Sequence, residues 1–308
     1  MKFYAYLLSV LCLLAPSAWA AQPIKIISAF PAGSGPDVFS RQIANQMAAN
    51  LKTPVIVINR PGGNGAVAMN HALNEKDPEN VVLFASNDNL IVYPLLTNDS
   101  KLVDQFVPFR EALWSELVLA TGPAVSSVDK IFQSSRVSYG SWGIGSAPHL
   151  MGSELSSRNN HKDSVHVPYK DYGAWFSDIN SGTLSFSFVS IASTEGLEKA
   201  GRIKYHAVAA PARSSRYPNL PTLQELTGQT LSLIGWAGFY TVDSMSPARA
   251  QQLKSAFDQA YSTTEVRELA KTLNYNFRNL SLDEFKRAVA QDQKNYKEII
   301  KKYNIRIE

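Results

Sequence analysis

The sequence predicts an α/β protein of two hinged lobes, each a mostly parallel sheet flanked by helices, joined by two crossover strands. Three observations support this class. Beyond residue 21, short β-rich runs alternate with longer segments of helical period, which is typical of α/β domains. Two runs, 116–130 and 234–247, each carry a strand followed by turn-forming residues, and they bracket the middle third of the chain. The length of 308 residues is enough for two packed domains.

The first twenty residues, MKFYAYLLSVLCLLAPSAWA, are expected to be a secretory signal peptide rather than part of the fold. They contain one lysine, a continuous apolar core and a small-x-small ending, Ala18-Trp19-Ala20, after which we expect cleavage. No later run of about 18 apolar residues follows, so we expect the mature chain to be soluble. Cys12 lies in this segment, and the preceding SVL disfavours a lipid-modified cysteine.

The mature chain would contain no thiol, which excludes disulfides, thiolate metal sites and cysteine nucleophiles. Loss of Lys2 removes one of 30 basic side chains and lowers the formal net charge from +4 to +3. Lysine and arginine are spread along the chain rather than clustered. This distribution argues against a nucleic-acid partner and weakly favours small anionic ligands.

The first lobe is expected to begin with a strand at 24–30, IKIISAF, followed by a helix. This helix carries an apolar stripe at every fourth position, formed by Phe39, Ile43, Met47 and Leu51. A second strand (PVIVINR, 54–60), a second helix (GAVAMNHALNE, 65–75) and a third strand (NVVLFAS, 80–86) come next.

Six further runs are predicted strands, at 117–123, 137–141, 165–169, 184–190, 204–210 and 236–242. Helical segments such as 149–157 and 172–182 separate them. From the two crossings we expect residues 21–122 and 240–308 to form lobe 1 and residues 123–239 to form lobe 2, an arrangement that allows hinge motion.

The C-terminal third contains helices whose first residues can be recognised. Ser246-Pro247 is an N-cap followed by proline in the first helical position. Ser281-Leu-Asp-Glu284 is a capping box. The helix that follows is expected to turn Phe285, Ala288, Val289, Tyr296 and Ile300 inward and to leave its lysines in water.

AFPAGSGPD, residues 29–37, joins the first strand to the first helix. Ser34 and Asp37 fit a capping pattern with Pro36 in the first turn, so we expect the helix to begin at or just after Ser34. A helix terminus presents unpaired N–H groups and the positive end of a dipole, and Gly33 and Gly35 leave room for a ligand. A plain tight turn that binds nothing is the alternative.

A similar turn recurs in VSYGSWGIGSAPHLMGSEL, residues 137–155. There a strand runs into Gly140, Gly143, Gly145 and Ser146, and Pro148 opens a helix. If each lobe carries one such turn, the lobes form a cleft with donors on both walls.

Cofactor and nucleophile motifs are weak. A dinucleotide site needs a third glycine and an acid ending the second strand. Here the pattern runs Gly33-x-Gly35-x-x-Val38 and that strand ends at Asn59, which disfavours NAD. No Gly-Lys-Ser/Thr follows either turn, and no serine occupies a Gly-x-Ser-x-Gly elbow.

Metal and acid–base sites are equally weak. The histidines show no ligand pair at helical spacing, and we interpret them as surface or core residues, with His149 the exception to test. Asp37 is interpreted as a helix cap. Asp88 follows the third strand at the carboxyl edge of the sheet, where ligands bind, but a turn-forming role in SNDN is favoured. Four aromatics are assigned to the core or domain seam: Trp142, Tyr169, Trp175 and Trp236.

Six stretches together resemble one family, the extracytoplasmic substrate-binding receptors of tripartite tricarboxylate transporters, also called Bug receptors. They are PIKIISAFPAGSGPDVFSRQIANQM, PVIVINRPGGNGAVA, VSYGSWGIGSAPHLMGSEL, VHVPYK, LEKAGRIKYHAVAAPARSSRYPNLPTLQEL and WAGFYTV. The resemblance implies a type II periplasmic-binding-protein-like fold and a periplasmic receptor that closes on a small organic acid, typically a di- or tricarboxylate or an aromatic or amino-acid carboxylate. It also implies membrane permease subunits as partners and no enzymatic role; we expect a monomer without cofactor or metal.

The resemblance places the ligand at the two turns, Phe30 to Gly35 and Ser141 to Ala147. The ligand-binding residues that we expect are Phe30, Pro31, Ala32, Gly33, Ser34, Gly35, Asp37, Asn87, Ser141, Trp142, Gly145, Ser146, Ala147, His149 and Ser190. One departure concerns the first turn, where the usual AGGGTD is AGSGPD, so that Pro36 removes a backbone donor and a hydroxyl. A sensor accessory protein and a secreted α/β enzyme are the alternative functions.

Overall fold

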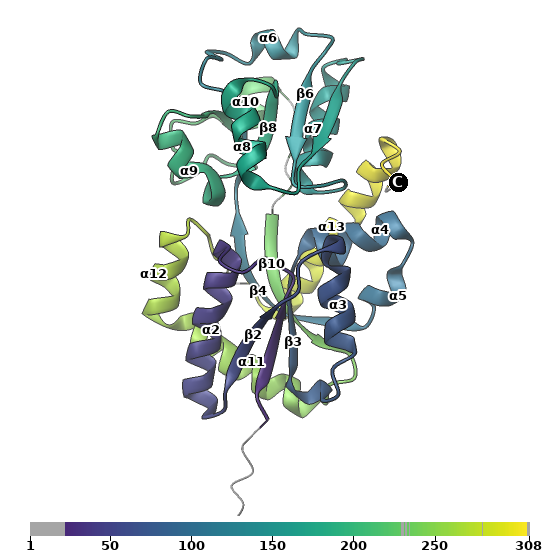
Figure 1. Ribbon diagram of the computed structural model, residues 1–308, viewed down its shortest axis with the longest axis vertical. Coiled ribbons are helices and arrows are strands. Elements are labelled where there is room, and N and C mark those ends of the chain that lie inside the picture. Colours follow the sequence, from purple (N-terminus) through teal and green to yellow (C-terminus); the bar gives the residue numbers. More distant parts are fainter. Residues whose placement is uncertain (1–21, 229–230, 232, 234, 279, 307–308) are drawn as a thin grey trace, which may run out of the picture.

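The computed structural model describes residues 22–228, 231, 233, 235–278 and 280–306. The expected signal peptide, 1–20, lies outside these residues. Figure 1 shows two lobes stacked along the long axis and joined through the middle by extended chain. Each lobe contains a five-stranded sheet with helices on its faces, which confirms the predicted two-lobed α/β class. Within the described residues, no helix is long and apolar enough to span a bilayer.

Lobe 1 contains the sheet β2-β1-β3-β10-β4. Its strands are β1 (Ile24–Ser28), β2 (Val55–Asn59), β3 (Val81–Ser86), β4 (Phe106–Ser115) and β10 (Gly235–Val242). Its longer helices are α2 (Gly35–Leu51), α3 (Ala66–Leu73), α11 (Pro247–Ser262), α12 (Thr264–Thr272) and α13 (Leu282–Lys302). Short helical segments lie between β2 and β4: η2 (Gly63–Gly65), η3 (Pro78–Asn80), η4 (Asp88–Val92), α4 (Tyr93–Thr97) and α5 (Ser100–Val103).

Lobe 2 contains the sheet β7-β6-β8-β5-β9. Its strands are β5 (Leu117–Thr121), β6 (Ser138–Ser141), β7 (Val165–Pro168), β8 (Phe186–Ser190) and β9 (Lys204–Val208). Its helices are α6 (Asp129–Phe132), α7 (Ala147–Arg158), α8 (Tyr172–Ser181), α9 (Ile191–Lys199) and α10 (Leu223–Thr227).

Both sheets are mixed rather than mostly parallel. β1, β2 and β3 run parallel, as do β6, β7 and β8. The strands next to the crossings, β10 in lobe 1 and β5 in lobe 2, are antiparallel to their neighbours. A strand that follows a crossing enters its sheet from the edge that faces the other lobe. The parallel strands of the sheet end at this edge, so the entering strand runs antiparallel to them.

The predicted lobe boundaries need correction. β5 pairs with β8 and β9, so residues 117–121 belong to lobe 2 and the first crossing lies at Glu116, not at 122. β10 pairs with β3 and β4 from Gly235 onward, so the return crossing precedes the predicted residue 240. Each crossing therefore lies near the first residue of the run predicted to contain it, 116–130 for the first and 234–247 for the second.

The predicted helix starts are confirmed. Ser34, Ser246 and Ser281 are the N-caps of α2, α11 and α13, and each side chain accepts a hydrogen bond from the backbone three residues on. Phe285 and Tyr296 of α13 are buried. The far end of α13 leaves lobe 1 and reaches α7 of lobe 2, where Lys302 Nζ lies 3.0 Å from Glu154 Oε1.

Candidate functional site

The β1–α2 turn is held from inside by Asp37. Its carboxylate accepts hydrogen bonds from the Gly33 amide (2.8 Å) and from Asn59 Nδ2 (2.7 Å). Burial raises the pKa of Asp37, but bonds from Asn59, Arg41 and Gly33 outweigh it and keep the pKa below the usual value. Asp37 is thus a structural clamp as well as a residue of the first helical turn.

The clamp uses part of the donor set that we expected for a ligand. The Gly33 amide is bonded to Asp37 and the Ser34 amide to the Pro31 carbonyl (3.2 Å). Among the described residues, the amides of Ala32 and Gly35 have no hydrogen-bond partner. The turn therefore uses two of its amides for its own geometry and leaves those of Ala32 and Gly35 for a ligand.

The β6–α7 turn is also internally bonded. The Ser141 hydroxyl lies 2.7 Å from His166 Nε2 and accepts the Gly143 amide at 3.1 Å. The Ser146 hydroxyl donates to the Gly143 carbonyl at 2.7 Å, and the Gly145 amide donates to His149 Nδ1 at 2.9 Å. These bonds fix the turn and place the N-terminus of α7 toward lobe 1.

His149 supports this turn and is not arranged as an exposed ligand donor. Its ring stacks on that of His166, with centroids 3.7 Å apart and planes inclined by 15°. Burial and the neighbouring His166 lower the pKa of His149 to about 3, and burial lowers that of His166 to about 4. Both rings are therefore neutral at neutral pH, which leaves His149 Nδ1 free to accept the Gly145 amide.

Gly145 lies close to lobe 1. Its φ is +81°, which favours glycine, and a Cβ placed on it would lie 2.3 Å from Leu96 Cδ1 and 2.8 Å from Val92 Cγ1. Asn64 Nδ2 also donates to the Ile144 carbonyl across the lobes, at 3.5 Å. The second turn is therefore in contact with η4 and α4 of lobe 1.

Asp88 lies where the lobes meet. From the sequence it was interpreted as a turn-forming residue rather than a ligand-binding one. Trp142 Nε1 of lobe 2 donates to Asp88 Oδ2 at 2.8 Å. Only 7% of Asp88 is exposed. Burial raises the pKa of Asp88 to about 6, although the Trp142 indole and the Ala147 amide act in the opposite direction. The side chain thus lies at the N-terminus of α7.

Two tyrosines that the sequence did not single out complete this region. A Cβ placed on Gly35 would lie 3.0 Å from the Tyr275 ring, so this ring covers the start of α2. Desolvation and then the Asp88 charge raise the pKa of Tyr172 to about 12. Desolvation and then Tyr172 likewise raise the pKa of Tyr275. We call the two turns together with Asp88, Trp142, Tyr172 and Tyr275 the interlobe site.

Two expected ligand residues are used elsewhere. The Asn87 amide donates to Tyr296 Oη at 2.7 Å and accepts the Trp236 amide at 3.3 Å, both inside lobe 1. Ser190 Oγ lies 2.7 Å from Ser115 Oγ, next to the first crossing. Both side chains are therefore hydrogen-bonded within the chain, and their role in ligand binding stays a prediction.

With this geometry in place, the comparison with known families is decisive. A family model for the tripartite tricarboxylate transporter family receptor matches residues 39–305. The chain belongs to this receptor family. A UPF0065 protein of Bordetella bronchiseptica is 26% identical over 214 residues, which are 67% of this chain and 64% of that relative. The chain thus spans slightly less than two thirds of the relative's length. Protein BugT of Bordetella pertussis is 25% identical over 218 residues, 68% of this chain and 67% of BugT.

Several solved structures share the fold. The periplasmic binding protein BugD superposes with a TM-score of 0.78 at 18% identity, over 93% of this chain and 99% of BugD. A Rhodopseudomonas palustris protein with adipate superposes with a TM-score of 0.78 at 19% identity, over 94% of this chain and 99% of that protein. MatC of the same organism, with bound malate, superposes with a TM-score of 0.75 at 17% identity, over 91% of this chain and 100% of MatC. These likenesses confirm the two-lobed periplasmic-binding-protein fold.

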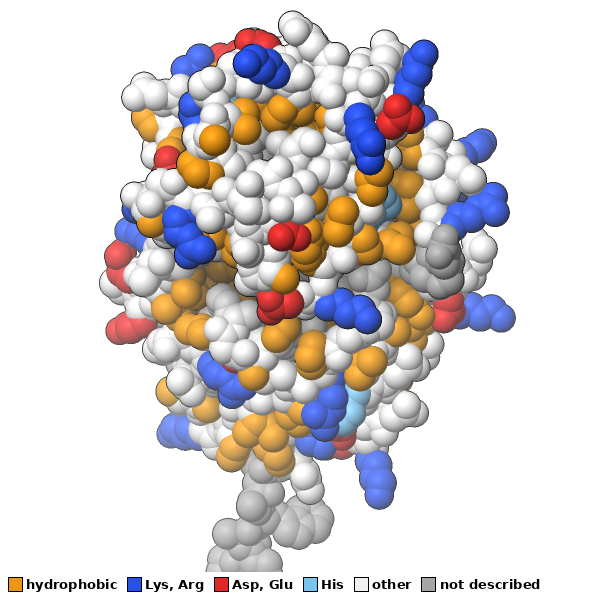
Figure 2. Space-filling model, turned by 45° about the horizontal axis from the view of Figure 1, so that its top comes forward, with side chains coloured by type: hydrophobic (Ala, Val, Ile, Leu, Met, Phe, Trp, Pro, Cys, Tyr) orange, Lys and Arg blue, Asp and Glu red, His pale blue; other side chains and the backbone are white. Residues whose placement is uncertain are grey.

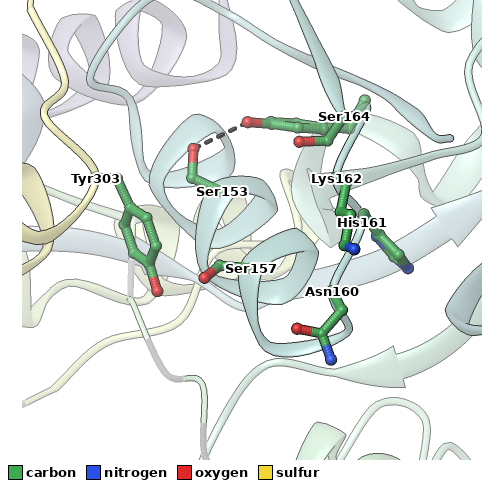
Figure 3. A pocket seen from close by; sticks show the side chains of 8 residues that line it. Ser153, Ser157, Asn160, His161, Lys162, Ser164 and Tyr303 are labelled. Carbon is green, nitrogen blue, oxygen red and sulfur yellow. Dashed lines mark hydrogen bonds between the residues drawn. The ribbon is translucent and has the colours of Figure 1, made fainter. Parts of the chain in front are cut away.

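The receptor also carries a pocket of about 410 Å³ away from the interlobe site. In the view of Figure 3, Ser153 and Ser157 of α7 stand between Tyr303, which follows α13, and Lys162. None of its lining residues was predicted to bind ligand. Figure 2 shows lysine and arginine scattered over the displayed face, where they form no basic patch.

Proposed function

We propose that this protein is a periplasmic solute receptor that binds a small organic acid between its lobes and delivers it to the permease subunits of a tripartite tricarboxylate-type transporter. One observation carries the proposal: the glycine-containing turn before α7 is held against lobe 1 beside Asp88, and Trp142 donates to that carboxylate across the lobes. Membership of the receptor family supports it, as do the malate and adipate bound to proteins of the same fold.

The turns bind by uncharged donors in this proposal. Neither turn contains lysine or arginine. The N-terminus of α2 offers the Ala32 and Gly35 amides and the positive end of its dipole to a carboxylate. Ligand binding stabilises the arrangement with the lobes in contact, which shifts the population toward it, and exclusion of water strengthens each hydrogen bond. The ligand leaves unchanged, so we assign no enzymatic role.

Thermal unfolding with a panel of organic acids tests the proposal. An acid present at 100 times its dissociation constant should stabilise the folded protein by about 2.7 kcal/mol. Mass spectrometry of the purified protein should find the same acid, chemically unchanged. A panel of mono-, di- and tricarboxylates and amino acids that leaves the melting temperature unmoved would contradict the proposal.

A pair of glycine variants tests where the acid binds. Gly33 has φ +78° and no other residue within 4 Å of a Cβ, so Gly33→Val adds strain and a side chain at the first turn. Gly201→Val is the matched control, because Gly201 has φ +67° and equally open surroundings beyond α9. Both variants should lose similar stability, but only Gly33→Val should bind the acid more weakly. Equal affinities in the two variants would reject the first turn as part of the site.

A further inference from the structure

Asp88 is a buried carboxylate without a cation. It is 7% exposed, and its Oδ2 accepts the Trp142 indole N–H. Its Oδ1 is buried and has no hydrogen-bond partner among the described residues. Within the same residues, no lysine, arginine or histidine lies within 4.0 Å of it as an ion-pair partner.

The other buried acids of the protein are arranged differently. Glu111 is 3% exposed and pairs with Arg278, and Glu154 is 3% exposed and lies 3.0 Å from Lys302. A buried charge is normally paired, because water can no longer solvate it. Asp88 departs from this pattern at the point where the two lobes meet, because the chain offers it the Trp142 indole and the N-terminus of α7 but no cation.

The surroundings of Asp88 define which partner fits. The Trp142 indole turns its N–H edge to the carboxylate and Tyr172 carries a phenol, so both neighbours are uncharged and leave the Asp88 charge without a counterion. A second ligand carboxylate at this position would face the Asp88 charge and be repelled. An ammonium group would instead donate to the unpaired Oδ1, while the ligand carboxylate is received by the amides of the first turn.

We propose that Asp88 binds the ammonium group of the ligand, so that the receptor takes an amino-bearing carboxylic acid in preference to the amine-free acid of the same skeleton. This inference rests on the proposed receptor function and narrows its substrate class. Trp142 is then a positioning residue, because its N–H holds Oδ2 and orients Oδ1 toward the ligand.

The test uses pairs of acids that differ only in the amine: aspartate and succinate, glutamate and glutarate, phenylalanine and 3-phenylpropionate. Calorimetric titration of the full mature protein should show at least tenfold tighter binding of the amino member of the pair that fits. Asp88→Asn keeps the shape and the hydrogen bond to Trp142 but removes the charge. It should lose at least tenfold in affinity for the amino member and little for the amine-free acid.

Asp292→Asn is a matched control, because Asp292 also accepts a tryptophan indole N–H, from Trp236 at 2.7 Å, but lies inside lobe 1. It should keep the wild-type preference for the amine. The inference is overturned if the wild type binds both members of every pair equally or prefers the amine-free acids, or if Asp88→Asn keeps the amine preference. The wild-type comparison needs no variant to fold. If no acid of either kind binds, the receptor proposal itself fails.

Discussion

Gly145→Ala tests whether the lobes must touch for ligand to bind. The new Cβ would lie 2.3 Å from Leu96 Cδ1 and 2.8 Å from Val92 Cγ1, and both of these side chains belong to lobe 1. The residue would also keep a φ of +81°, which costs an L-residue about 1 to 2 kcal/mol. Overpacking at a close contact costs about 1 to 3 kcal/mol more.

These two costs act on different states. The backbone strain is present whether or not the lobes touch, whereas the overlap exists only when they are in contact. If ligand binding requires that contact, the overlap of about 1 to 3 kcal/mol should weaken binding about 5- to 150-fold. Calorimetric titration with the tightest acid of the panel measures this loss directly.

Gly182→Ala separates the strain from the overlap. Gly182 ends α8 with φ +77° and has nothing within 4 Å of a Cβ, so its alanine variant carries the strain alone. Urea unfolding should show a loss in both variants, while affinity should fall only in Gly145→Ala. If the two variants bind the acid with affinities within twofold of each other, the assumption that the lobes close on the ligand is wrong.

Three further outcomes follow from the site. As pH falls from 6.5 to 5, His149 becomes protonated in the unfolded state but not in the folded state, where its pKa is lowered to about 3, so the wild type should lose stability. His149→Asn keeps an acceptor for the Gly145 amide, and between these two pH values its free energy of unfolding, measured with urea, should fall by about 1.5 kcal/mol less than that of the wild type. Asp37→Asn should lower the free energy of unfolding by about 1.5 to 3 kcal/mol at pH 7, because a charged acceptor is lost. Lys302→Ala should change it by under about 1 kcal/mol in the same assay, since the lysine is solvent-exposed and the buried Glu154 keeps its ion pair with Arg158.

Features that depend on a few neighbouring residues could be predicted. Ser34, Ser246 and Ser281 were each identified as helix starts, and each is an N-cap. Helix caps can be recognised in a sequence because the capping hydrogen bond joins residues three apart and does not depend on distant parts of the chain. The apolar stripe of α2 succeeded for the same reason, with Phe39 and Ile43 fully buried.

Features set by distant parts of the chain could not be predicted. β4 was missed because Pro108, Arg110 and Glu111 interrupt its apolar pattern, and an edge strand with register shifts tolerates all three. The lobe boundary at 122 was wrong because the lobe of β5 is decided by its partners, β8 and β9, and not by its own residues.

The site shows the same division. The two turns were found from local glycine, serine and proline signals, but the bonds that use their amides come from Asp37 and His149, whose orientation a sequence does not give. Asp88 was placed correctly at the carboxyl edge of its sheet, yet its importance depends on Trp142 of the other lobe, 54 residues away.

The use of the turn amides supports a ligand with two unlike ends. In the first turn Pro36 has no N–H, and the Gly33 amide already donates to Asp37. Among the described residues of this turn, the amides of Ala32 and Gly35 are without a partner and can donate to a ligand carboxylate. That is enough for one carboxylate beside a helix terminus. At the N-terminus of α7 the position facing the dipole is already occupied by the Asp88 carboxylate. A ligand that reaches both lobes therefore meets donors at one end and an anion at the other, which matches an acid with an amine better than an acid with two carboxylates.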